Sequence, residues 1–278
     1  MNMAKGLYRV ARPFNALSGA LAVFLGGYVA GTGAWLNISL AALATFFVTG
    51  ASNAWNDYLD VEIDRINKPN RPLPSGQITR PAVLVFSLVC TAIAVLLALL
   101  INLPALLVVV ISSILLYVYS WKLKSTVILG NATVAAVSAS SSLFGGLAAG
   151  NVRPTLWLVV IMAAGMMMRE VLKTIADYDG DLAQRVRTVA TVWGKRRAWW
   201  LFMALAVITM VVMTLPSFFN EFGRIYLLII VVVVIPIIFY VLSSVRPDRS
   251  ALVLERHSQL IKYTFLVWFL AVFLGAAI

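Results

Sequence analysis

The sequence predicts an all-α integral membrane protein with about nine transmembrane helices. Of its 278 residues, 62% are hydrophobic and 12% are charged, whereas soluble domains average about 45–50% apolar and about 25% charged residues. The mean hydropathy is +0.93. The apolar residues also gather into stretches of about 20, which is the length that a helix needs to cross a bilayer.

Each predicted helix is one of these apolar stretches. Pro81, Pro104 and Pro154 stand near the beginning of their stretches, where a missing N–H group costs nothing. Pro236 lies inside the eighth stretch and is expected to kink it. The nine stretches are residues 14–33, 36–57, 81–101, 104–121, 128–149, 154–176, 197–216, 224–244 and 258–278.

The first stretch follows Lys5, Arg9 and Arg12, and in this respect it resembles a secretory signal peptide. It is, however, longer than the apolar region of a signal peptide, and no small-x-small cleavage site ends it. We therefore interpret it as a retained first helix.

The connections between the stretches fall into two alternating groups. One group is short and carries only Arg153, Glu221 and Arg224, whereas the other is long and basic. Because basic residues collect in cytoplasmic loops, we expect the N-terminus and the basic group in the cytoplasm, and the C-terminus on the other side. Topology explains most of the net charge of +11 in this way, so the charge does not indicate a nucleic-acid partner. The basic connections hold Arg65, Lys68, Arg71 and Arg80, then Lys122 and Lys124, then Arg185, Arg187, Lys195, Arg196 and Arg197, then Arg246, Arg249 and Arg256.

Eight of the eleven acidic residues lie in two windows, at the predicted cytoplasmic ends of the second and sixth stretches. In the first window Asn53, Asp57, Asp60 and Asp64 step by four, three and four residues, so they share one face of a helix. Carboxylates in this arrangement repel one another and are costly near a bilayer core, so they need a cation. Mg²⁺ accepts such oxygen ligands, together with phosphate oxygens and water. Solvated acids at a helix end are the alternative.

The second window ends with Asp177 and Asp181, one helical turn apart. Two acidic windows at the same membrane face predict a two-sided site that holds a diphosphate through Mg²⁺. Arginine and lysine are the usual phosphate binders, although pairing within the helix is the alternative for those in the second window. The candidate phosphate binders are Arg71, Lys124, Arg169 and Lys173.

The second acidic window belongs to the second helix of a second set of four. We therefore interpret residues 1–278 as a single transmembrane domain with two possible four-helix halves, 14–121 and 128–244, and a last helix, 258–278.

Several segments together match a known family pattern. Asn56-Asp57-Tyr-Leu-Asp60-Val-Glu-Ile-Asp64 has the form Asn-Asp-x-x-Asp-x-x-x-Asp, and it is followed by Arg71-Pro-Leu-Pro-Ser-Gly76, Tyr119-Ser-Trp-Lys-Leu-Lys124 and Gly130-Asn131. In these segments the chain resembles the UbiA superfamily of intramembrane prenyltransferases. The family's second motif is Asp-x-x-Asp-x-x-x-Asp, and here Thr174 replaces its first aspartate.

The resemblance implies helices around a central cavity, and Mg²⁺-dependent transfer of a prenyl group from its diphosphate to a lipophilic acceptor in the membrane. The Arg71 loop and the stretch from Arg169 to Asp181 look most like digeranylgeranylglyceryl phosphate synthases. That subfamily implies a geranylgeranyl donor and geranylgeranylglyceryl phosphate as the acceptor. The alternatives are chlorophyll synthase-like, aromatic or quinone prenyl transfer, terpene cyclisation, and ion or lipid transport. The oligomeric state stays open.

The resemblance also implies a role for each matching residue. The implied metal ligands are Asn53, Asp57, Asp60, Asp64, Asp177 and Asp181, of which the five aspartates are also the catalytic residues. The implied substrate-binding residues are Asn53, Asn56, Arg71, Tyr119, Lys124, Asn131, Arg169 and Lys173. Tyr58, Tyr117 and Tyr119 are candidates for stabilising an allylic cation with their ring faces, and packing is the alternative.

Overall fold

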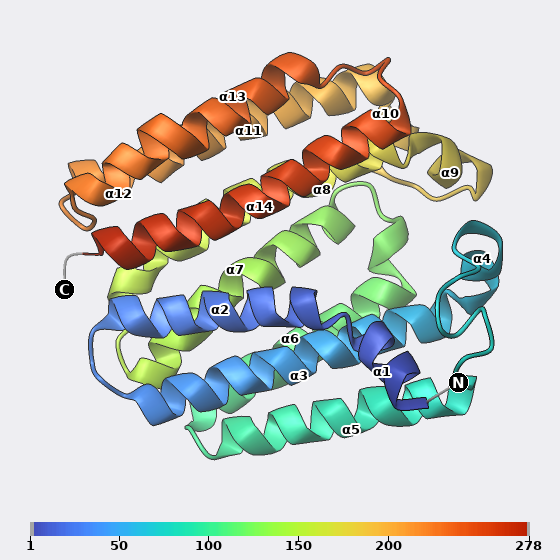
Figure 1. The fold of residues 1–278 in the computed structure, drawn as a ribbon, viewed down its shortest axis with the longest axis horizontal. Helices are drawn as coiled ribbons and strands as arrows, with labels where there is room; N and C mark the ends of the chain where they lie inside the picture. Colours follow the sequence, from blue (N-terminus) through green and yellow to red (C-terminus); the bar gives the residue numbers. More distant parts are fainter. Residues whose placement is uncertain (1–2, 277–278) are drawn as a thin grey trace. The chain divides into compact units, whose positions relative to one another are not determined.

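The computed structural model describes residues 3–276, without the side chains of residues 66 and 67, and within this range helices dominate (Figure 1). Nine of the described helices are long and apolar enough to cross a membrane, which confirms the predicted number. They are α2 (Pro13–Ala30), α3 (Trp35–Leu59), α5 (Arg80–Leu99), α6 (Leu103–Trp121), α7 (Leu129–Ala149), η2 with α8 (Arg153–Thr155 and Leu156–Ala176), α11 (Lys195–Phe218), α12 to α13 (Arg224–Ser244) and α14 (Ala251–Gly275). The short helices are α1 (Met3–Ala11), α4 (Val61–Asn67), η1 (Leu123–Ser125), α9 (Tyr178–Ala183) and α10 (Val189–Trp193).

Two predicted boundaries are wrong by several residues. α2 ends at Ala30 rather than at residue 33, because Gly31 takes a left-handed conformation with φ 69° and closes the helix. α14 begins at Ala251 rather than at residue 258, because Glu255, Arg256 and His257 interrupt its first two turns and an apolar search stops at them. The predicted end of that helix, residue 278, lies outside the described residues.

The eighth span is distorted next to its proline. Ile230–Val234 forms a π-helical turn between α12 (Arg224–Ile229) and α13 (Ile235–Ser244). Pro236 has no N–H group to donate to the carbonyl one turn earlier, so the hydrogen-bond ladder changes register at this point. The sequence predicted a disturbance at Pro236, and the structure shows which form it takes.

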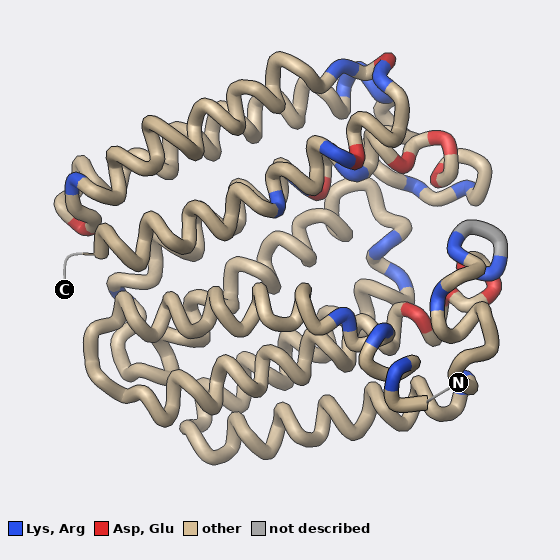
Figure 2. The backbone as a smooth tube through the Cα atoms, in the orientation of Figure 1, with Lys and Arg blue, Asp and Glu red and all other residues tan. Residues whose placement is uncertain are grey.

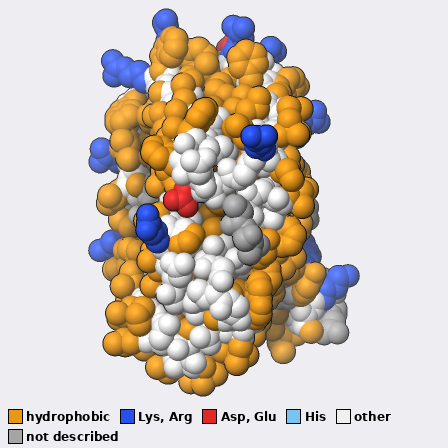
Figure 3. Space-filling view, turned by 90° about the vertical axis from the view of Figure 1, so that its left-hand side faces the viewer, with side chains coloured by type: hydrophobic (Ala, Val, Ile, Leu, Met, Phe, Trp, Pro, Cys, Tyr) orange, Lys and Arg blue, Asp and Glu red, His pale blue; other side chains and the backbone are white. Residues whose placement is uncertain are grey.

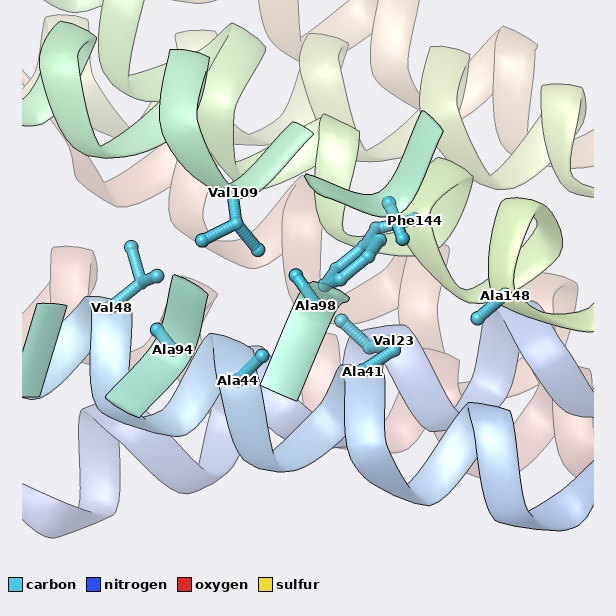
Figure 4. Packing of buried hydrophobic residues seen from close by; sticks show 10 residues of the cluster. Val23, Ala41, Ala44, Val48, Ala94, Ala98, Val109, Phe144 and Ala148 are labelled. Atoms are coloured by element: carbon cyan, nitrogen blue, oxygen red, sulfur yellow. The ribbon is translucent and has the colours of Figure 1, made fainter. Parts of the chain in front are cut away.

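The chain divides into two compact units. The first unit comprises residues 1–122 and 140–155, and the second comprises residues 123–139 and 156–278, so α7 contributes to both. Small residues dominate the core of the first unit, which allows its helices to approach closely, and Phe144 fills the space between them (Figure 4). This core consists of Val23, Ala41, Ala44, Val48, Ala94, Ala98, Ala105, Val109, Phe144 and Ala148.

Two glycines set the crossing of α2 with the second half of α7. A Cβ atom on Gly145 would lie 1.9 Å from the Val23 carbonyl oxygen, and one on Gly26 would lie 2.1 Å from the Ser142 carbonyl oxygen. Only glycine fits at such distances, so the small residues of α7 serve helix packing here.

In the second unit α8 packs against α11 and α14. Gly165 of α8 leaves room for the Phe265 ring, and the buried Trp268 of α14 donates from Nε1 to the Tyr226 hydroxyl at 3.4 Å. α14 therefore lies directly beside the helix that leads into the second acidic window.

The surface carries many large apolar side chains, as one face shows (Figure 3). Leu36 and Leu100, for example, are more than two-thirds exposed. Such a surface is unfavourable in water and suits contact with lipid.

Candidate active site

The first acidic window contains a helix boundary. α3 ends at Leu59, Asp60 (φ −85°, ψ 5°) forms the junction, and α4 begins at Val61. The expectation of one unbroken helical stripe from Asn53 to Asp64 is therefore wrong. Aspartate disfavours helix interiors, because its side chain competes for nearby backbone groups. Turn-like hydrogen bonds still cross the junction, since the Asp64 N–H donates to the Asp60 carbonyl at 2.8 Å.

Two arginines neutralise the buried carboxylates of the first unit. Asp57 is only 2% exposed and Asp64 only 5%. Arg71 Nη1 donates to Asp57 Oδ1 at 3.1 Å and to Asp64 Oδ2 at 2.5 Å. Arg12 also forms an ion pair with Asp57 Oδ1. The structure thus brings together three residues of the predicted site, and it adds Arg12, which the sequence did not single out.

The two asparagines of this window have separate partners. Asn56 donates from Nδ2 to Asp60 Oδ2 at 2.9 Å, so it orients a predicted metal ligand. Asn53 donates from Nδ2 to the Ala11 carbonyl at 3.0 Å and so anchors the end of α1. These contacts place Asn56 beside a carboxylate and Asn53 at the contact with α1.

Sequence inspection missed α1 and its link to the Arg71 loop. Arg9 donates from Nη1 to Gln77 Oε1 at 2.9 Å and from Nη2 to the Asn70 carbonyl at 3.0 Å, which are two points of that loop. Arg12, at φ 50°, then turns the chain from α1 into α2. The available signal was the amphipathic pattern of residues 3–11, which places basic residues on one helical face and apolar residues on another. Figure 2 shows the basic positions of this segment in blue.

The aromatic candidates of the first unit are engaged in packing. The Trp55 ring stacks on Tyr58 at 5.5 Å and on Tyr117 at 5.1 Å between centroids. The Arg80 guanidinium lies 4.5 Å from the Tyr58 centroid. These contacts favour the packing interpretation of Tyr58 and Tyr117. Tyr119 lies in the last turn of α6.

The second acidic window repeats the backbone of the first. α8 ends at Ala176, Asp177 (φ −87°, ψ 3°) forms the junction, and α9 follows. The Asp181 N–H donates to the Asp177 carbonyl at 2.8 Å, as Asp64 does to Asp60. In this register Thr174 corresponds to Asp57, and its buried hydroxyl donates to the Val171 carbonyl at 2.8 Å. Both windows therefore bend at the second of the three motif positions, which is Asp60 in the first window and Asp177 in the second.

The bases of the second window pair with a buried acid. Lys173 Nζ donates to Glu170 Oε2 at 3.0 Å, and Arg169 Nη1 donates to Glu170 Oε1 at 3.4 Å. Pairing within the helix is thus present, although the partner is Glu170. Sequence inspection left Glu170 without a role, and its spacing of three residues from Lys173 was the signal for this pair.

Asp181 lies among groups of both signs. Burial and the neighbouring Asp177 raise the pKa of Asp181 to about 6, while the Thr188 hydrogen bond, Lys124 and Lys173 act to lower it. A carboxyl group with this environment carries its charge most readily when a cation is present.

Asn131 supplies an available hydrogen-bond donor. Its Nδ2 atom is buried, and within the described residues it has no hydrogen-bond partner. A buried amide without a partner is costly, and a bound oxygen ligand would satisfy it.

The carboxylates fit Mg²⁺ only with outside ligands. Among the described residues, no three His, Cys, Asp or Glu side chains are arranged to hold a metal by themselves. Mg²⁺ typically binds one or two carboxylates and completes its shell with water and substrate phosphates. The donor chemistry therefore suits a metal that arrives with a phosphate ligand.

Comparisons with known proteins agree on one family. The UbiA prenyltransferase family pattern matches residues 18–270. The digeranylgeranylglyceryl phosphate synthase of Natronomonas pharaonis is 36% identical over 233 residues, covering 83% of this chain and 84% of the relative. That of Methanosphaera stadtmanae is 33% identical over 267 residues, covering 96% and 97%.

Solved structures show the same fold. A structure from work on digeranylgeranylglyceryl phosphate synthase in membranes has a TM-score of 0.81 and 29% identity, over 99% of both chains. A UbiA homologue from Archaeoglobus fulgidus, bound to GPP and Mg²⁺, has a TM-score of 0.72 and 19% identity, over 96% of this chain and 99% of that one.

Proposed function

This chain belongs to the UbiA prenyltransferase family, and from that premise we propose that it transfers a geranylgeranyl group from its diphosphate to geranylgeranylglyceryl phosphate. The observation that carries the proposal is the near full-length similarity to synthases of digeranylgeranylglyceryl phosphate, 33% over 96% of the chain. The product is a diether lipid phosphate of the membrane.

We propose that the metal ligands come from both acidic windows. They are Asn53, Asp57, Asp60, Asp64, Asp177 and Asp181. Mg²⁺, when bound, supplies positive charge to the departing diphosphate. The burial of Asp57 and Asp64 beside arginines supports this assignment, because these carboxylates already require cations in the metal-free protein. The family member from Archaeoglobus fulgidus that binds GPP and Mg²⁺ supports it as well.

The remaining candidates are assigned to the substrates. Arg71 and Lys124 stabilise the negative charge that develops on the diphosphate as its bond to the allylic carbon breaks. This is electrostatic catalysis at developing charge. Asn131 offers its buried amide to a phosphate oxygen. Asn56 orients Asp60, and Tyr119, Arg169 and Lys173 complete the substrate-binding set. The hydroxyl oxygen of the acceptor then bonds to the allylic carbon, and its proton leaves.

The orientation in the membrane is part of the proposal. The basic loops and the N-terminus lie in the cytoplasm, and the C-terminus lies on the other side, because basic residues favour the cytoplasmic face. Accessibility of a single cysteine introduced into the loop after α9 tests this orientation, since the native Cys90 is buried.

The decisive experiment measures pyrophosphate release from geranylgeranyl diphosphate by the purified protein in detergent. We expect release only when both Mg²⁺ and geranylgeranylglyceryl phosphate are present. Release without any acceptor would indicate cyclisation or hydrolysis, and release only with an aromatic acceptor would indicate a quinone or chlorophyll pathway. No release with any donor or acceptor would favour transport.

A variant pair tests the site itself. Asp60→Ala should abolish release in a protein that still inserts into membranes, whereas Asp179→Ala should not, because Asp179 is highly exposed and pairs only loosely with Lys195 at 3.5 Å. Normal turnover of inserted Asp60→Ala would refute the assigned metal ligands.

A further inference from the structure

Three exposed arginines, Arg196, Arg246 and Arg249, form an arginine cluster where α11 begins and α13 ends. Trp199, one helical turn after Arg196, donates from Nε1 to the Val245 carbonyl at 2.8 Å and so holds α11 against the end of α13. Arg246 follows directly, and the Arg249 N–H donates to the Arg246 carbonyl at 3.2 Å, which keeps these two residues in one turn. Figure 2 shows the basic positions at this end of the second unit in blue.

The arginine cluster is not neutralised within the chain. Among the described residues, none of the three arginines has an ion-pair partner. Asp248 lies in the same turn and is exposed, yet it pairs with none of them. The neighbouring Lys195 is directed elsewhere, because its Nζ lies 3.5 Å from Asp179 Oδ1 and 4.5 Å from the Tyr178 ring centroid. Positive charge therefore remains available at the surface of the second unit.

The position of Arg196 does not stabilise its own helix. It is the second residue of α11, and a positive charge near a helix N-terminus opposes the helix dipole. The preference of basic residues for cytoplasmic loops explains on which membrane side the cluster lies. It does not explain why two helix ends bring their arginines together. An anion outside the chain would account for this arrangement.

The exposed face of α11 continues from the cluster into apolar residues. Residues spaced by four, seven and four share one face of a helix, and here they are Arg196, Trp200, Val207 and Val211. Trp200, Val207 and Val211 are each at least half exposed. Tryptophan is typical of the membrane–water interface, and the aliphatic residues beyond it suit lipid chains. This order follows a lipid from headgroup to chain, whereas a soluble polyanion would leave the aliphatic part uncovered.

We propose that the arginine cluster binds the phosphate of an anionic membrane phospholipid, whose chains lie along this face of α11. Guanidinium groups form paired hydrogen bonds with phosphate oxygens, and basic sites between transmembrane helices bind anionic lipid headgroups. The hydrogen bond between α11 and α13 fixes the arrangement before the lipid arrives. The cluster lies outside both acidic windows, so the proposal does not depend on the proposed reaction.

The first test measures lipid selectivity through quenching of tryptophan fluorescence. The protein is reconstituted into phosphatidylcholine vesicles in which a minor fraction of the lipid is brominated, either as phosphatidylglycerol or as phosphatidylcholine. The difference between the wild-type protein and Trp200→Phe gives the quenching of Trp200 alone. We expect phosphatidylglycerol to occupy the site roughly fivefold more readily than phosphatidylcholine. Because exposed charges are screened by salt, this selectivity should fall at high ionic strength.

The second test removes the charges. The double variant Arg196→Gln/Arg246→Gln should lower the selectivity to less than about twofold, and Arg196→Lys/Arg246→Lys should retain part of it, because the charges remain but the paired hydrogen bonds are lost. The matched control is Arg153→Gln/Arg224→Gln, which removes two exposed arginines from the short connections. It should keep the selectivity of the wild-type protein.

Equal quenching of Trp200 by the two brominated lipids in the wild-type protein would overturn the proposal, even if the arginine variants did not fold. Full selectivity in Arg196→Gln/Arg246→Gln would overturn it as well, and so would an equal loss of selectivity in the control, which would indicate a general effect of charge. Displacement of phosphatidylglycerol by polyglutamate or by an RNA oligonucleotide would assign the cluster to a soluble polyanion instead.

Discussion

Removal of Arg71 should destabilise the metal-free protein strongly. Its guanidinium serves both Asp57 and Asp64, and 23% of its side chain is exposed. Removing one partner of a buried ion pair typically costs about 3–5 kcal/mol. In Arg71→Gln, Asp57 still pairs with Arg12, so Asp64 is the carboxylate that loses its cation. We therefore expect a loss of unfolding free energy at the lower end of this range, about 3 kcal/mol. At about 2–4 °C per kcal/mol, the unfolding midpoint should fall by roughly 6–12 °C.

The assay is thermal unfolding in detergent, first with EDTA and then with saturating Mg²⁺. Arg65→Gln is the matched control, because its ion pair with Glu62 is 60% and 67% exposed and should contribute less than about 1 kcal/mol. Mg²⁺ should recover more stability in Arg71→Gln than in the wild-type protein, since it neutralises the carboxylates that the arginine leaves behind. Equal losses in both variants, or a loss that Mg²⁺ does not change, would refute the reasoning.

Three further predictions concern packing, pH and α1. Gly145→Ala should lower stability by about 3 kcal/mol, because its Cβ would lie 1.9 Å from a carbonyl of α2, while Gly180→Ala, with open space around it, should be nearly neutral in the same unfolding assay. Because the pKa of Asp181 is raised to about 6, a proton competes with Mg²⁺ below that pH. The Mg²⁺ concentration for half-maximal activity should therefore rise roughly tenfold from pH 7 to pH 5, and a flat profile would contradict this. Arg9→Gln should raise KM for the prenyl diphosphate several-fold, because it removes both hydrogen bonds that hold the Arg71 loop. Lys5→Gln on the same helix is the control and should leave KM unchanged. Equal effects of the two variants would indicate a general effect of lost positive charge.

The repeated bend at the acidic windows explains a limit of motif reading. Spacing alone placed Asn53, Asp57, Asp60 and Asp64 on one helical face. The structure instead ends a helix at the second aspartate, and it does so again at Asp177. Spacing assumes an uninterrupted helix, whereas an aspartate in a helix competes for nearby backbone groups and can end it.

Local signals in the sequence determined the fold class, the number of spans and the two acidic motifs. A stretch of about 20 apolar residues satisfies its own backbone hydrogen bonds as a helix, so its state does not depend on distant partners. The residues of each motif lie within a few helical turns of one another, so each motif can be identified from the sequence alone. The replacement of an aspartate by Thr174 can be identified in this way as well.

Tertiary structure alone decided which residues far apart in the sequence meet. Arg12 and Asp57 are 45 residues apart, and Arg169 and Ser258 are 89 residues apart, so no periodicity of the chain relates them. These contacts follow from the packing of α1 and α2 on α3, and of α14 on α8. A buried charge needs a partner, and the partner can come from any segment that packs against it. Helix formation depends on a local stretch of sequence, whereas this pairing depends on the whole folded chain.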